Sequence, residues 1–315
     1  MTRVLGLDIG GSQSRAQLCI DGEVVAESQA ASASVVAAGA ARAEAALAQL
    51  LAQLPLDQAQ LLDALCVGSA ADKVPATRQF LTSTLAPLTR SGTVLIVSDA
   101  MLVLPAAGLP AGIAVICGTG SIAVGSHQGG SVQSGGWGYL LGDEGSGYWI
   151  VRAAVRALLD RRDRGVPSGP LGQRLFASTG AADIATLQEL FYEQPRPRDW
   201  AAHAPLVLDS ADEAVTGITA EAATALAGLA ASAAERLAAP VALPVVLAGG
   251  LFNHGGLEAA ARTAIARALP GSEVRKLAAP PVTGAVRLAQ QAAEKQQAAE
   301  QDAPTVMTNP PRATM

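Results

Sequence analysis

The chain has 315 residues, half of them hydrophobic, and a formal net charge of −5 at pH 7. This length favours two domains over one, and the composition allows sizeable hydrophobic cores. The sequence has no long basic run, which argues against a nucleic-acid partner. It also has no stretch with the ~18 uninterrupted apolar residues of a membrane span.

No secretory leader precedes the first strand-like run, so we expect a cytoplasmic protein without a membrane partner. The cysteines are widely spaced in apolar contexts, which is neither a disulfide framework nor a paired metal-binding motif. We interpret them as buried small hydrophobes in a reducing compartment. They are Cys19, Cys66 and Cys117.

The first part of the chain reads as an antiparallel meander followed by alternating helices and strands. The expected strands are 4–9, 15–20, 24–28, 63–67 and 93–97. Two helices are expected between them, 34–54 before Pro55 and 75–85 after a first-turn proline. This alternation predicts an α/β domain.

The strand pattern then restarts, with strands at 113–117, 121–126 and one that opens at Val132. Later segments predict helices over 147–163, 256–268 and 281–297, a mostly helical region over 170–240, and strands at 245–247 and 273–277. Residues 4–12 and 113–121 align without a gap, as strand, glycine turn and strand. This weak internal repeat predicts two similar domains, 1–111 and 112–300, with 301–315 as a flexible tail.

Glycine turns follow strands at three places, 10–11, 118–120 and 249–250. Glycine lets backbone N–H groups converge on a concave surface that binds phosphate oxygens. Nearby hydroxyls that add hydrogen-bond donors are those of Ser12, Ser14, Thr119 and Ser121. After the first two turns the chain continues as a strand, which argues against a P-loop or a dinucleotide-binding fold.

Several carboxylates adjoin these turns. Asp8 either caps the first turn or, beside a polyphosphate, holds Mg²⁺ through water. Asp99 ends a buried strand, where it is either a helix N-cap or a base for a substrate hydroxyl. Asp143 and Glu144 lie in a glycine-rich loop with Trp137, as solvated turn charges or as ligands of a polyhydroxylated molecule. The three histidines share no metal-ligand spacing and are interpreted as ordinary residues.

Together these motifs resemble the N-acetylglucosamine kinase branch of the BadF/BadG/BcrA/BcrD ATPase family, in the actin, Hsp70 and sugar-kinase superfamily. The resemblance covers residues 3 to about 290. The motifs that carry it are Asp8-Ile9-Gly10-Gly11-Ser12, Gly118-Thr119-Gly120-Ser121, the block from Gly135-Gly136-Trp137-Gly138 to Gly142-Asp143-Glu144-Gly145-Ser146-Gly147-Tyr148-Trp149, Leu247-Ala248-Gly249-Gly250 and Pro281-Val282-Thr283-Gly284-Ala285.

The resemblance implies two ribonuclease-H-like α/β domains that face a hinged cleft. It implies an ATP-dependent kinase for the 6-hydroxyl of an amino sugar, N-acetylglucosamine or glucosamine, with Mg²⁺ as cofactor and a homodimer as a common state. Asp8 would hold the metal, and Asp99 would be the base. The sugar would meet Asp99, Thr119, Trp137 and Asp143. ATP would meet Gly10, Gly11, Ser12, Ser14, Gly118, Thr119, Gly120, Ser121, Gly249 and Gly250.

Two other functions stay open. The same family contains ATP-driven activators of CoA-ester reductases and dehydratases, which need exposed cysteine ligands for a shared iron–sulfur cluster. The other alternative is a non-catalytic sugar sensor on a kinase fold. Retained carboxylates at Asp8 and Asp99 argue against the sensor, and sugar-dependent ATP turnover would exclude it.

Overall fold

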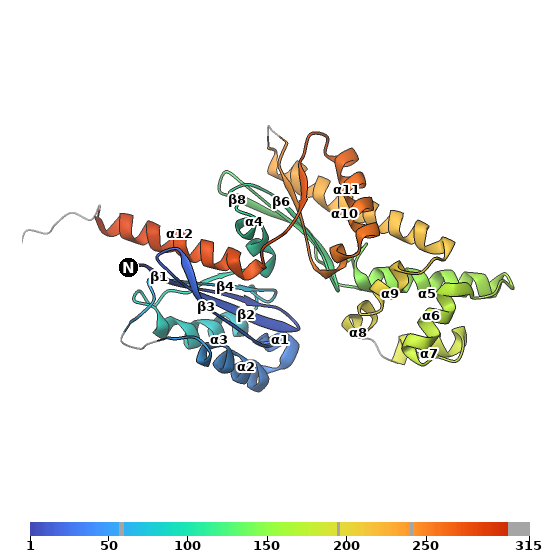
Figure 1. Ribbon diagram of the computed structural model, residues 1–315, viewed down its shortest axis with the longest axis horizontal. Coiled ribbons are helices and arrows are strands. Elements are labelled where there is room, and N and C mark those ends of the chain that lie inside the picture. The colour runs from blue at the N-terminus through green and yellow to red at the C-terminus, as the bar shows by residue number, and fades with distance from the viewer. Residues whose placement is uncertain (57–59, 194–195, 240–241, 302–315) are drawn as a thin grey trace, which may run out of the picture. The chain divides into compact units, whose positions relative to one another are not determined.

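The computed structural model describes residues 1–56, 60–193, 196–239 and 242–301. The chain forms two compact units (Figure 1). The first contains Met1–Asp99 and the segment from Pro281 onward, and the second contains Ala100–Pro280. Nearly all of the expected tail, 302–315, lies outside the described residues.

These units differ from the expected ranges 1–111 and 112–300 at two places. The 3₁₀ turn Asp99–Leu102 and helix α4 (Val103–Ala106) pack through Ala100, Val103 and Leu104 on the second sheet. The last helix, α12 (Pro281–Gln301), packs instead on strands of the first sheet. In both cases a helix belongs to the unit whose sheet it packs against, whatever its position along the chain.

The first unit is built on a five-stranded mixed sheet in the order β3-β2-β1-β4-β5. Its strands are β1 (Arg3–Ile9), β2 (Gln13–Ile20), β3 (Glu23–Ala31), β4 (Ala64–Ser69) and β5 (Leu95–Val97). The meander β1–β2–β3 is antiparallel, while β1, β4 and β5 run parallel. The carboxyl ends of the three parallel strands therefore meet at one edge, where ligands of α/β proteins commonly bind.

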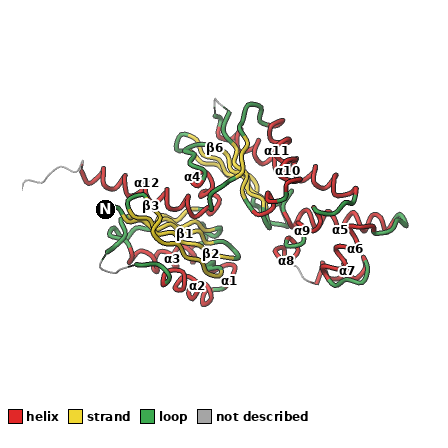
Figure 2. Tube along the Cα trace, viewed as in Figure 1, coloured by secondary structure: helices red, strands yellow, loops and turns green. Residues whose placement is uncertain are grey.

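Helices cover both faces of this sheet (Figure 2). Side chains of α2 (Ala40–Ala52) and α3 (Pro75–Leu85) share a core with Leu5, Leu7 and Ile9 of β1. Helix α12 packs on the other face, against β1, β2 and β4. The helix expected over 34–54 is two helices, α1 (Val35–Ala38) and α2, because Gly39 has φ +82°.

The second unit repeats this topology. Its five-stranded sheet has the order β10-β9-β6-β7-β8, which is the first order read from the other side. The strands are β6 (Gly112–Cys117), β7 (Ser121–His127), β8 (Gly130–Gly135), β9 (Val245–Ala248) and β10 (Val274–Lys276). The internal repeat predicted from the sequence is thus confirmed in the strand order of the two sheets.

The alignment of the repeat is shifted by one residue from the gap-free alignment of the sequence. Ile9 pairs with Ser14 across the first turn, and Cys117 pairs with Ser121 across the second. The first turn has one residue more between its paired ends. Every second strand residue faces the core, namely Leu5, Leu7 and Ile9 in the first unit and Ile113, Val115 and Cys117 in the second, so Cys117 corresponds to Ile9. Asp8 therefore corresponds to Ile116 and not to Cys117.

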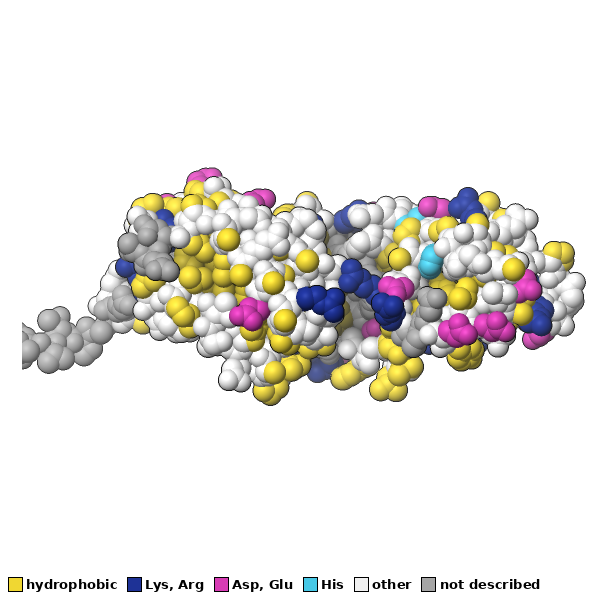
Figure 3. Space-filling model, turned by 90° about the horizontal axis from the view of Figure 1, so that it is seen from below, with side chains coloured by type: hydrophobic (Ala, Val, Ile, Leu, Met, Phe, Trp, Pro, Cys, Tyr) yellow, Lys and Arg dark blue, Asp and Glu magenta, His cyan; other side chains and the backbone are white. Residues whose placement is uncertain are grey.

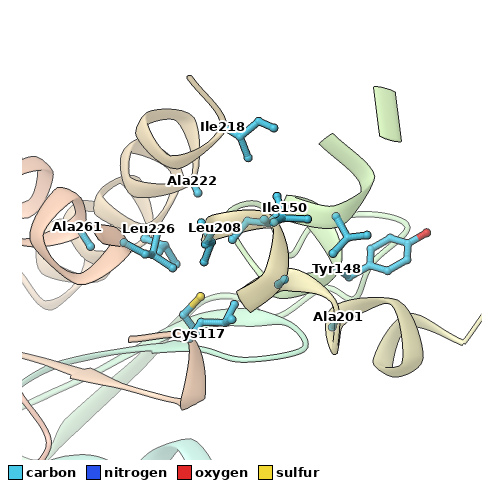
Figure 4. Close-up of a cluster of buried hydrophobic side chains, with 14 of the residues drawn as sticks. Cys117, Tyr148, Ile150, Ala201, Leu208, Ile218, Ala222, Leu226 and Ala261 are labelled. Carbon is cyan, nitrogen blue, oxygen red and sulfur yellow. The ribbon is translucent and has the colours of Figure 1, made fainter. Parts of the chain in front are cut away.

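Helices pack on one face of the second sheet and extend beyond it. They are α5 (Gly147–Asp163), α6 (Gly169–Thr179), α7 (Ile184–Glu193), α8 (Pro197–Ala201), α9 (Ala204–Leu208), α10 (Glu213–Leu237) and α11 (Gly255–Ala268). Figure 4 shows Cys117, at the end of β6, beneath side chains of this cluster that include Leu208 and Leu226. The core thus joins the strand end at the second glycine turn to α9 and α10.

Helix α10 is long and apolar enough, by length and composition, to cross a membrane. Its buried residues, among them Ile218, Leu226 and Ala230, belong to the hydrophobic core of the second unit. A core helix accounts for this composition. On the face drawn in Figure 3, Lys and Arg side chains form small groups interspersed with acidic ones.

Candidate active site

In the first unit, two carboxylates lie where the parallel strands end. Asp8 is the second-last residue of β1, and Asp99 follows the end of β5. Between these strands runs β4, where the residue paired with Asp8 is Gly68, which contributes no side chain there. Burial and the negative charge of Asp99 raise the pKa of Asp8 to about 6, while Arg15 acts in the opposite direction. A bound cation would relieve this repulsion.

The first glycine turn leaves part of its surface open. The N–H of Gly10 donates to the carbonyl of Gln13 at 3.1 Å, and the hydroxyl of Ser32 donates to the carbonyl of Gly10 at 2.8 Å. These bonds fix the start of the turn. Gly11 and Ser12 are exposed, and a Cβ at Gly11 would meet no atom within 4 Å. This is the part of the turn that a phosphate could approach.

Two of the four predicted hydroxyl donors are buried. Ser14 is fully buried, and its Oγ accepts a hydrogen bond from the N–H of Ala33 at 2.9 Å. Ser121 is 2% exposed, and its hydroxyl donates to the carbonyl of Glu144 at 2.7 Å. Both residues lie at the start of the returning strand of a hairpin, Ser14 as its second residue and Ser121 as its first, and their hydroxyls hold neighbouring loops. Ser12 and Thr119, in contrast, have exposed side chains.

In the second unit, the N-terminus of α5 holds the turn at 118–120. The N–H of Gly147 donates to the carbonyl of Gly118 at 2.8 Å, and that of Tyr148 to the carbonyl of Thr119 at 3.4 Å. Ser146 caps the helix by accepting from the N–H of Trp149 at 3.3 Å. The free N–H groups of the helix are thereby used within the protein. The helix positions the turn and is not itself an anion site.

Asp143 is bound to the same turn. Its carboxylate accepts backbone hydrogen bonds from Ser121 and Gly138, while burial, as the largest effect, raises its pKa. A Cβ at Gly120 would lie 2.7 Å from Oδ2 of Asp143, so only glycine allows this close approach. The sequence suggested a solvated charge or a sugar ligand. The structure adds a third role, in which Asp143 joins the turn to the glycine-rich loop.

Trp137 stands on that glycine-rich loop with 69% of its surface exposed. The loop is fixed nearby, because Tyr139 packs edge-on against Tyr148 of α5 with ring centroids 5.1 Å apart. An exposed tryptophan on a fixed loop is available to a ligand, since an indole offers an apolar face and one hydrogen-bond donor.

The third glycine turn adjoins the second within the sheet. Strand β9 runs parallel to β6, and Ala248 at its end pairs with Ile116. The next residue, Gly249, lies so close to the backbone of Cys117 that a Cβ would be 2.2 Å from its carbonyl oxygen. A Cβ at Gly250 would meet nothing within 4 Å. The glycine turns at 118–120 and 249–250 therefore lie side by side, and Gly250 faces open space.

The second unit contains a cavity of about 500 Å³ that the sequence did not indicate, lined by residues that include Ser210, Asp212, Thr216 and His254. Its walls come from the segment before α10, the first turns of α10, and the start of α11. His254 follows Gly250 by four residues, so the cavity adjoins the third glycine turn along the chain. The signal available beforehand was Asp212, a typical N-cap before a long apolar helix.

Residues 5–287 match the model of one protein family, which covers most of the chain. The chain belongs to the BadF/BadG/BcrA/BcrD ATPase family. Family membership confirms the resemblance drawn from the glycine motifs, and it implies ATP as a ligand.

Two curated relatives are named as kinases of N-acetylated amino sugars. An N-acetylmuramic acid/N-acetylglucosamine kinase of Clostridium acetobutylicum is 32% identical over 171 residues, which are 52% of this chain and 56% of the relative. An N-acetyl-D-glucosamine kinase of Dictyostelium discoideum is 32% identical over 188 residues, 56% of this chain and 59% of the relative. The matched region is thus between half and two thirds of each curated relative.

Among solved structures, a candidate N-acetylglucosamine kinase of Chromobacterium violaceum is similar with a TM-score of 0.73 and 26% identity. That match covers 92% of this chain and 99% of the other. The two-domain α/β fold is therefore shared over the whole length of a solved relative.

Proposed function

We propose that this protein is an ATP-dependent kinase that phosphorylates the 6-hydroxyl of an amino sugar, N-acetylglucosamine or glucosamine. The observation that carries the proposal is the half-buried Asp8 beside Asp99 at the ends of parallel strands, close enough for the charge of Asp99 to raise the pKa of Asp8. Two curated relatives at 32% identity are named as kinases of N-acetylated amino sugars, which supports this substrate class.

In this proposal Asp99 orients the sugar 6-hydroxyl and accepts its proton as the oxygen attacks the γ-phosphoryl group. Phosphoryl transfer depends mostly on positioning and charge stabilisation, so the base is needed late in the step. Backbone N–H groups of the glycine turns hold phosphate oxygens. Thr119, Trp137 and Asp143 serve the sugar, with Asp143 acting partly through the turn that it holds.

Mg²⁺ is the metal we propose, with Asp8 holding it through water. The donor set fits, because Asp8 carries a charge that its neighbour Asp99 disfavours and a cation would offset. Among the described residues no group of three or more His, Cys, Asp and Glu side chains could hold a metal. Mg²⁺ suits such a sparse site, since it keeps several waters and takes other ligands from substrate phosphates. When bound, the ion neutralises charge that develops on the phosphates.

The nucleoside end of ATP, we propose, occupies the cavity beside His254. Its volume of about 500 Å³ falls within the roughly 300–1,000 Å³ usual for ligand pockets. Gly250 lies four residues before His254, which lines the cavity, and a Cβ at Gly250 would meet nothing within 4 Å. We therefore propose that the expected contact of Gly249 and Gly250 with adenosine is made through Gly250. Gly249 serves the close packing of the two turns.

The activator alternative is weakened by the cysteines. All three are buried and unpaired with one another, and burial raises the pKa of Cys66 and of Cys117 to about 12. Cluster ligands are thiolates, which such surroundings disfavour. Buried free thiols also fit the cytoplasmic location that we propose.

A coupled ADP-release assay over hexoses and amino sugars tests the proposal. We expect turnover that needs both Mg²⁺ and an amino sugar, with a 6-phosphate product identified by mass spectrometry. A protein that binds N-acetylglucosamine by calorimetry without releasing ADP would instead be a sugar sensor. A protein that hydrolyses ATP without responding to any sugar would also refute the proposal.

A further inference from the structure

The wall of the 500 Å³ cavity includes Ser210, Ala211 and Asp212, which belong to a short segment, residues 209–212, that is held at both ends. Its sequence is Asp-Ser-Ala-Asp, between α9 and α10. Each terminal aspartate binds a different helix, and the serine between them lines the cavity. We call these four residues the 209–212 segment.

The C-terminal anchor is a buried ion pair. Asp212 receives two hydrogen bonds from Arg161 of α5, at 2.8 and 2.5 Å, and their side chains are 2% and 14% exposed. It also accepts from the N–H groups of Leu171 and Ala214, at 3.3 and 3.1 Å. The hydrogen bonds from Arg161 hold the pKa of Asp212 below its usual value. A carboxylate with this many partners has little freedom to move.

The N-terminal anchor involves a histidine. Nε2 of His254 lies 3.0 Å from Oδ1 of Asp209, and its Nδ1 accepts from the N–H of Leu257 at 3.3 Å as the N-cap of α11. In the neutral ring with a proton on Nε2, one nitrogen donates and the other accepts, so both contacts are satisfied. The 209–212 segment is thereby held between α5 and α11.

Ser210 has no such partner for its side chain. The residue is 7% exposed, and its hydroxyl is buried without a hydrogen-bond partner among the described residues. A buried hydroxyl left unpaired lowers folding stability. The residue lines the cavity, so a rotation of its side chain would allow a ligand there to complete the hydrogen bond.

We infer that Ser210 is a nucleoside-contacting residue that sets the affinity for the phosphoryl donor. The inference rests on the proposed function, which places the nucleoside in this cavity. A hydroxyl both donates and accepts, and one χ1 rotation redirects it, so it matches the nitrogen and oxygen atoms of a base or ribose. Asp212, Arg161, Asp209 and His254 are positioning residues, because they hold the segment that carries Ser210.

The test compares S210A with S28A. Ser28, on β3 of the first unit, is also 7% exposed with a buried, unpartnered hydroxyl, and it does not line this cavity. Calorimetry with Mg·ATP should show S210A binding roughly 3–10-fold more weakly than the wild type, the usual loss for one hydrogen bond. S28A should bind as the wild type does. Neither variant should have a lower Tm, because each loses an unpaired hydroxyl.

Turnover gives a second readout. In S210A the KM for ATP should rise by the same factor, while kcat and the KM for the sugar stay within about twofold. Equal ATP affinity in S210A and the wild type would overturn the inference, as would an equal loss in S28A. If S210A does not fold, S210C preserves the size of the side chain with a weaker donor and should show the same loss. The binding assay needs no sugar, so it separates this inference from the proposed kinase activity.

Discussion

Gly249 and Gly250 are neighbours with opposite surroundings, and exchanging each for alanine gives a matched pair. Gly249 has φ +101° and ψ 154°, a region that is essentially restricted to glycine. A Cβ there would lie 2.2 Å from the carbonyl oxygen of Cys117 and 2.7 Å from its carbon. Gly250 has no positive φ, and a Cβ would meet nothing within 4 Å.

The expected destabilisation of Gly249→Ala has two parts. The backbone conformation costs about 1–3 kcal/mol for a non-glycine residue. The added carbon forces a shift of the packed backbone of Cys117, at about 1–3 kcal/mol. A loss near 4 kcal/mol would lower the Tm of a unit of this size by roughly 8–16 °C. Gly250→Ala should leave the Tm unchanged or slightly higher, because it restricts the unfolded chain at a compatible site.

Differential scanning calorimetry of both variants, with the wild type as reference, measures this difference. Gly250→Ala should fold normally and should raise the KM for ATP, since its methyl group would occupy the open side proposed for the nucleotide. If Gly249→Ala unfolds at the same temperature as Gly250→Ala, the close approach of the third glycine turn to the second is not what requires glycine at 249. If Gly250→Ala leaves the KM unchanged, the nucleotide does not touch that side.

Three other variants test individual side chains. Since Asp8 has a pKa of about 6 in the folded protein against 3.8 ordinarily, its ionisation costs stability as pH rises between these values. In denaturation without ligand, Asp8→Asn should therefore be up to about 3 kcal/mol more stable than the wild type above pH 6, and equal to it near pH 4. A difference that is constant with pH would refute this. Asp99→Asn should lower kcat by about 10²–10⁴-fold, the loss of a general base, and change sugar affinity by calorimetry less than about tenfold. A near-normal kcat would make Asp99 a structural residue. Trp137→Ala should raise the KM for the sugar about tenfold, while its Tm stays close to that of the wild type because the side chain is exposed; an unchanged KM would remove Trp137 from the sugar site.

The sequence predicted the strands and long helices well because their signals are local. Helices α3 and α5 begin and end at the predicted residues. A proline marks the first turn of α3, and a glycine marks the start of α5. The strand that contains Asp8 next to its last residue and the strand that precedes Asp99 were also predicted, so the placement of both carboxylates followed from the pattern. The return of α12 to the first sheet could not be predicted, since it depends on contacts between residues about 280 positions apart.

The candidate site was predicted less completely than the fold. The residue type and the position next to a glycine turn suggested hydroxyl donors at Ser14 and Ser121. Both are buried, because the pairing of the strands decides which face of the sheet each side chain occupies. The role of Asp143 at Gly120 depends on a loop that folds back on its turn. The contacts that hold residues 209–212 could not be predicted, because their partners, Arg161 and His254, are distant in sequence.

The two sheets share a topology but divide the charges unequally. The position of Asp8 in the first sheet corresponds to Ile116 in the second, and the residues after β10, 277–280, are Leu-Ala-Ala-Pro where Asp99 follows β5. A polyphosphate is repelled by a nearby carboxylate unless a cation lies between them. In the second unit the carboxylate of Asp143 accepts hydrogen bonds from the backbone N–H groups of Ser121 and Gly138, which offset part of the effect of burial on its pKa. A duplicated strand–turn–strand therefore explains why glycine turns recur. The differences at these two positions are the reason why we propose the metal and the base in the first unit alone.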